Sequence, residues 1–83
     1  MDIDNLVHMA NQIGDFFSAF PDREEAMMGI ATHIHKFWEP RMRVMILDGV
    51  ASNSLPELMP LVSKSLQKHG DALRPKLAAG LNT

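Results

Sequence analysis

The 83-residue sequence contains no cysteine and no tyrosine, and its longest uninterrupted apolar run is only residues 44–47. Without cysteine the chain cannot form a disulfide scaffold or a thiolate site for zinc or an iron–sulfur cluster. A run this short lies far below the roughly 20 residues that a membrane-spanning helix needs. Two acids among the first four residues also differ from the positive start of a signal peptide. We therefore expect a cytoplasmic protein that does not bind membranes.

The excess charge of either sign is also small, with ten Asp and Glu against eight Lys and Arg and a net charge of −2. A balanced chain of this kind releases few phosphate counterions, so nucleic-acid binding is disfavoured. The charge is uneven, because residues 1–25 hold six acids and one base. A helix-turn-helix DNA-binding protein built on the second and third predicted helices stays an alternative, although residues 26–53 have a net charge of only +1.

The sequence does contain apolar residues at helical spacing. Its length allows one domain. We predict an all-α fold, a small bundle of three to four helices over residues 1–70, followed by a C-terminal arm, 71–83, that is mobile in isolation. The first helix ends before Pro21, and its apolar positions are Ile3, Leu6, Met9, Ala10, Ile13, Phe16, Phe17 and Phe20. The second begins after an Asp22 cap and ends near residues 38–39, with Met27, Ile30, Ala31, Ile34, Phe37 and Trp38 on one face.

A third helix is predicted over residues 40–51, starting at Pro40, and a fourth over residues 60–69, ended by Gly70. The third has two apolar sides, one with Met42, Met45, Ile46 and Val50 and the other with Val44, Leu47 and Ala51. A surface helix needs only one apolar stripe. The third helix is therefore either central to the bundle or in contact with another molecule through its second side.

The histidines do not form a recognisable metal site. His33 and His35 lie two residues apart, which places them about 200° apart on a helix. His35 and Glu39 have a suitable spacing, but two ligands make a weak site. The sequence also has no glycine-rich phosphate loop and no arrangement typical of an activated nucleophile. We predict no catalytic, cofactor-binding or metal-binding residue in this chain, and a small metal-dependent enzyme is the disfavoured alternative.

Residues 33–43 combine a tryptophan, two arginines and a helix–proline–helix corner. Trp and Arg are enriched at binding hot spots, and the arginine fork suits carboxylates of another chain. The residues predicted to contact a partner are His35, Trp38, Arg41 and Arg43, with Val44 and Leu47 as apolar contacts. Alternatively, Phe37 and Trp38 close the core and the two arginines are solvated, with Asp48, seven residues from Arg41, balancing part of the charge.

Residues 6–13 (LVHMANQI) and 33–43 (HIHKFWEPRMR) resemble the two signature blocks of the delta subunit of NAD-dependent formate dehydrogenase. The resemblance covers roughly residues 4–70. It implies a non-catalytic accessory subunit that binds the catalytic (alpha) subunit and supports its assembly or stability. Asn11 and Gln12, within the first block, become further candidates for partner binding.

The resemblance also implies which cofactors lie elsewhere in the complex. Molybdopterin with molybdenum or tungsten, iron–sulfur clusters, FMN and NAD belong to other subunits, and this chain binds none of them. In isolation the chain can form homo-oligomers. The alternative within the same family context is a dissociable maturation chaperone for the molybdopterin-containing subunit.

Overall fold

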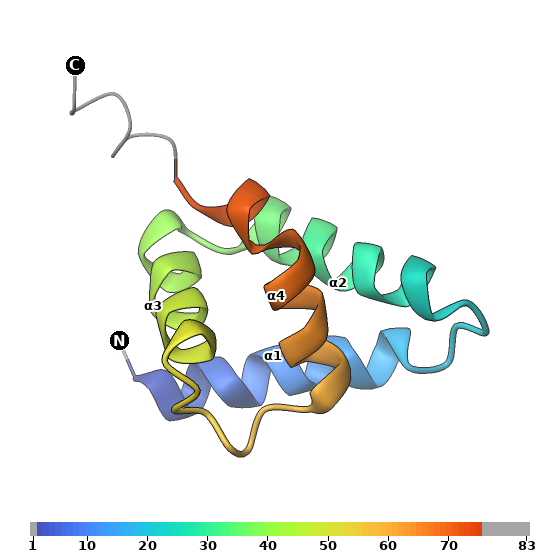
Figure 1. Cartoon of the computed structure of the whole chain (residues 1–83), viewed down its shortest axis with the longest axis horizontal. Coiled ribbons are helices and arrows are strands. Elements are labelled where there is room, and N and C mark those ends of the chain that lie inside the picture. The colour runs from blue at the N-terminus through green and yellow to red at the C-terminus, as the bar shows by residue number, and fades with distance from the viewer. Residues whose placement is uncertain (1, 76–83) are drawn as a thin grey trace.

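Helices form about 76% of the part of the chain that this computed structural model describes, residues 2–75 (Figure 1). They are α1 (Ile3–Phe17), α2 (Arg23–Phe37), α3 (Pro40–Ala51) and α4 (Pro60–Leu73). No strand occurs within these residues, so the predicted all-α class is confirmed. Most of the expected C-terminal arm, including Leu77, lies outside the described residues.

The helix starts follow from local chemistry. The Asp2 and Asp22 side chains each accept a hydrogen bond of 3.0 Å from the backbone N–H two residues on, at Asp4 and Glu24. Such caps satisfy backbone donors that the first turn leaves free. Pro40 and Pro60 occupy the first positions of α3 and α4, where a missing N–H costs nothing. The predicted starts of α2 and α3 are therefore confirmed.

The core lies where α4 packs against the other three helices. α1 and α2 run antiparallel, and α3 lies across one end of the pair (Figure 1). Ser65 of α4 is fully buried, and its Oγ donates a 2.6 Å hydrogen bond to the carbonyl oxygen of Met27 in α2. The apolar residues with almost no exposed surface are Leu6, Ala10, Ala26, Ile30, Ile34, Ile46, Val62, Leu66 and Leu73.

The prediction that Gly70 ends the fourth helix is wrong, because α4 continues to Leu73. Gly70 is buried within the helix, and a Cβ there would lie 3.3 Å from Cδ2 of Leu47 in α3. The glycine thus allows α3 and α4 to approach closely. Burial of Leu73 then stabilises the last turn, so packing outweighs the low helix propensity of glycine.

α3 is packed on two sides, which answers the question raised by its two apolar faces. Ile46 and Leu47 are both buried, although they point about 100° apart on the helix. Leu47 meets α4 at Gly70, whereas Gly49 lies against Leu55 of the following connection. On the second apolar side this chain itself buries Leu47, whereas Val44 is half-buried and Ala51 is exposed.

Two aromatic side chains expected in the core are on the surface. Phe16 of α1 is 67% exposed and Phe37 of α2 is 70% exposed. α1 also ends at Phe17 and does not reach Phe20. The face of α1 that is buried instead includes Val7 and Gly14.

Candidate functional site

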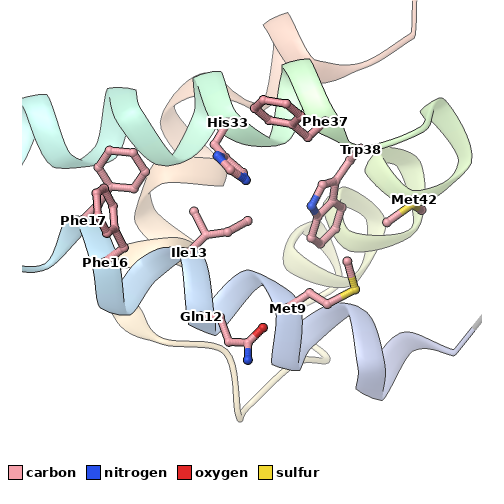
Figure 2. Close-up of a pocket in the computed structure, with 9 residues that line it drawn as sticks. All are labelled: Met9, Gln12, Ile13, Phe16, Phe17, His33, Phe37, Trp38 and Met42. Carbon is pink, nitrogen blue, oxygen red and sulfur yellow. The ribbon is translucent and has the colours of Figure 1, made fainter.

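An open groove of about 630 Å³ runs between α1 and α2 and is closed at one end by the start of α3 (Figure 2). Most of its lining is apolar or aromatic. Its walls are formed by Met9, Gln12, Ile13, Phe16, Phe17, His33, Phe37, Trp38 and Met42. Largely apolar, concave surfaces with a few polar groups are typical of binding sites.

The groove exists because the apolar arc of α1 is wider than the core can cover. At about 100° per residue, Phe16 lies roughly 160° around the helix from Gly14. Gly14 faces α4, and a Cβ there would meet Val62 Cγ2 at 2.5 Å. α1 is therefore pressed against α4 on its Gly14 side. The opposite edge of the arc, with half-buried Met9 and exposed Phe16, lines the groove.

Aromatic rings cluster at the end of the groove away from α3. The rings of Phe16 and Phe17 meet edge to face with centroids 5.0 Å apart, and Phe20 lies 5.1 Å from Phe17. Phe17 itself lies over Gly29 of α2, where a Cβ would be only 2.3 Å from Cε1 of the ring. The glycine allows Phe17 to pack inward, and Phe16 remains on the outer edge.

On the α2 side, His33 and Phe37 form the opposing wall. Their ring centroids are 4.7 Å apart, with a tilt of 43° between the planes. His33 is half-buried and points toward the groove (Figure 2). His35, one of the predicted contact residues, is exposed and lines a separate hollow of about 240 Å³ between α2 and α4.

Of the eight residues predicted for partner binding, only Gln12 and Trp38 line the groove. Gln12 is exposed. Trp38 is only 5% exposed and its indole lies between Met9 of α1 and Met42 of α3 (Figure 2). It forms the floor at the α3 end, so in this conformation its main contacts are within the chain.

Asn11 makes a structural contact within the chain. Its Nδ2 donates to the carbonyl of Glu57 at 3.0 Å, and its Oδ1 accepts from the backbone N–H of Met59 at 2.8 Å. One amide thus holds the connection between α3 and α4 against α1. This pairing explains the asparagine in the first signature block without any contact to another protein.

Arg41 and Arg43 do not form one basic patch. They lie two residues apart on α3, so their side chains leave the helix about 200° apart. Arg41 is exposed, whereas Arg43 is half-buried and its Nε is shielded from solvent without a hydrogen-bond partner among residues 2–75. Asp48, expected to balance Arg41, instead pairs with Arg74 at 2.9 Å. A DNA-reading face on α3 gains no support from this arrangement.

The two predicted apolar contacts differ in how much surface they offer. Leu47 is only 4% exposed because it packs against α4. Val44 is half-buried and retains accessible surface.

The sequence did not predict Phe16, Phe37 and His33 as groove residues. Their positions at one edge of the apolar arcs of α1 and α2 were the available signal, but that signal also fits a core residue.

Residues 2–75 contain no group of three or more His, Asp or Glu side chains arranged to hold a metal ion. None of the helices described there combines the length and apolar character needed to cross a bilayer.

Fold and groove together define a small all-α protein with an open apolar surface between two helices. A family model, described as the NADH-dependent formate dehydrogenase delta subunit FdsD, matches residues 5–66. The chain belongs to this family, as the two signature blocks indicated. No curated protein sequence and no solved structure matches the chain.

Proposed function

We propose that this chain is a non-catalytic accessory subunit that binds the catalytic subunit of an NAD-dependent formate dehydrogenase and supports its assembly or stability. Membership of the delta-subunit family carries the assignment to such a complex. The observation that favours a binding role is the open groove with exposed Phe16 and Phe37 on its two walls. Large exposed aromatic side chains around one concave surface are typical of interaction sites.

The reaction proposed for the complex is formate oxidation coupled to NAD reduction, in the cytoplasm. Molybdopterin with molybdenum or tungsten, iron–sulfur clusters, FMN and NAD would then be held by the other subunits. Absence of cysteine supports this division, because this chain has no thiolate for a cluster. Its part in the complex is to cover apolar surface on the large subunit, which would also stabilise the fold of this small chain by mass action.

The contact residues that we propose are those with accessible surface. Beside the two phenylalanines they include Gln12, His35, Arg41, Arg43 and Val44. Trp38, Leu47 and Asn11 are assigned a supporting role, because their main contacts lie within the chain.

Co-expression with the catalytic subunit tests the proposal. The catalytic subunit carries an affinity tag, and the native mass and formate-dependent NAD reduction of the purified complex are measured. We expect this chain in the active complex, and less active complex when it is omitted. If Arg41→Glu with Arg43→Glu leaves both the complex and its activity unchanged, the corner at the start of α3 is not part of the interface.

The same mass measurement separates a permanent subunit from a maturation chaperone. A subunit remains in the active enzyme at fixed stoichiometry. A chaperone is found only on the immature catalytic subunit and is absent once the enzyme is active.

A further inference from the structure

We infer that the α1/α2 groove receives one amphipathic helix of the catalytic subunit, whose apolar face fills the groove and whose Lys or Arg side chains lie over the acidic end beside Phe16. The inference rests on the proposed function and adds the surface and the chemistry of the partner segment. A helix laid into an apolar groove is a common mode of peptide recognition.

The first argument is the shape of the surface. Its two walls are antiparallel helices, and the groove is bounded on α1 by Met9 and Phe17, about 12 Å apart along the axis. Slightly more than two turns of a third helix cover this length. With Phe16 and Phe37 exposed on opposite walls, such a helix would bury both rings at once.

The second argument is charge. α1 carries acids and no Lys or Arg. Where α1 meets α2, Asp15, Asp22 and Glu25 are all exposed, and none of them forms an ion pair within residues 2–75. Glu25 lines a second depression of about 420 Å³, which shares Phe17, His33 and Phe37 with the groove.

Opposing positive charge near this end is limited. Arg23, at the start of α2, faces the other side of the molecule, where it lines a hollow with Lys64 of α4. Among the described residues, the groove is lined by no Lys or Arg and the second depression by one, Lys36. Lys36 is adjacent to Phe37 in the sequence. The Phe16 end therefore favours a positively charged partner segment, since complementary charge speeds association and fixes orientation.

Cross-linking within the co-expressed complex tests the occupant. Benzoylphenylalanine replaces Phe16, Phe37 or, as a control on the opposite surface, Gln67 of α4. Photolysis and mass spectrometry then identify the attached peptides. We expect positions 16 and 37 to attach to one helical segment of the catalytic subunit, with Lys or Arg nearest position 16, and position 67 not to attach to it.

Matched variants test the two contributions separately. Phe16→Ser with Phe37→Ser should weaken binding by about thirtyfold or more, because both rings would be buried on binding and are proposed as hot spots. Gln67→Ser changes an exposed side chain of α4 that lines neither the groove nor the second depression, and should change affinity less than threefold. Asp15→Lys with Glu25→Lys should slow association about tenfold at low salt. The control pair Glu57→Lys with Asp71→Lys makes the same change in net charge and should have a much smaller effect.

The outcomes distinguish failure of the proposed function from failure of the groove or charge assignment. If no complex forms with the wild-type chain, the proposed function fails. If the complex forms but positions 16 and 37 attach to a second copy of this chain, to several unrelated segments, or to nothing, the groove assignment is overturned while the subunit role stands. A single attached helix with carboxylates in place of Lys or Arg overturns the charge assignment. Equal loss of affinity in the Gln67→Ser variant would overturn the groove as the specific site.

Discussion

Replacing Asn11 by alanine should destabilise the fold, because one side chain holds two backbone groups of a connection that is 46 to 48 residues away in sequence. Each hydrogen bond contributes about 1 kcal/mol, and an N–H left buried without a partner adds a further cost. The expected loss is about 2–3 kcal/mol. For a domain of this size it corresponds to a fall in Tm of about 10–20 °C.

Thermal and urea unfolding of the isolated chain, followed by far-ultraviolet circular dichroism, measures this loss. Asn11→Leu retains side-chain volume but makes neither hydrogen bond, so it should be destabilised to a similar degree. The neighbouring exposed Gln12, whose side chain makes no hydrogen bond within residues 2–75, provides the control. Gln12→Ala should change stability by less than about 0.5 kcal/mol.

The reasoning would be refuted if the Tm of Asn11→Ala lay within ~2 °C of the wild-type Tm. A difference that small corresponds to less than about 0.5 kcal/mol in the free energy of unfolding. It would equally be refuted if Asn11→Leu were as stable as the wild type, because volume alone would then account for this position.

Three further changes should follow from packing and surface charge, and urea unfolding measures each of them. Trp38→Ala should cost about 3–5 kcal/mol, since a large buried side chain leaves a cavity between α1, α2 and α3. Gly14→Val should cost about 1–3 kcal/mol, because its Cβ would overlap Val62, and a neutral result would show that α1 can move away from α4. Arg74→Ala removes the exposed pair with Asp48 and should cost less than about 1 kcal/mol; a larger loss would indicate that this pair holds the end of α4 in place.

The sequence by itself determined the fold class and most helix boundaries. Asp22 and Pro40 act through their own backbone and side-chain geometry, so the starts of α2 and α3 followed without knowledge of the rest of the chain. The buried positions Ile30 and Ile34 also followed, since they lie at the centre of an apolar face and any packing partner would cover them.

Residues at the edges of those apolar faces depended on where the neighbouring helices lie. Phe16 and Phe37 have the same character as core residues. They are exposed because α4 packs against the Gly14 side of α1 and, at Ser65, against Met27 of α2. The same holds for Gly70, whose ability to end a helix was outweighed by contact with Leu47.

Tertiary structure alone also decided the role of Asn11, because its two partners lie in a distant connection and no local pattern marks them. Periodicity specifies which face of a helix is apolar, but not how much of that face its neighbours can cover. The groove between α1 and α2 is the uncovered remainder, and it results from three-dimensional packing of α1 against α4.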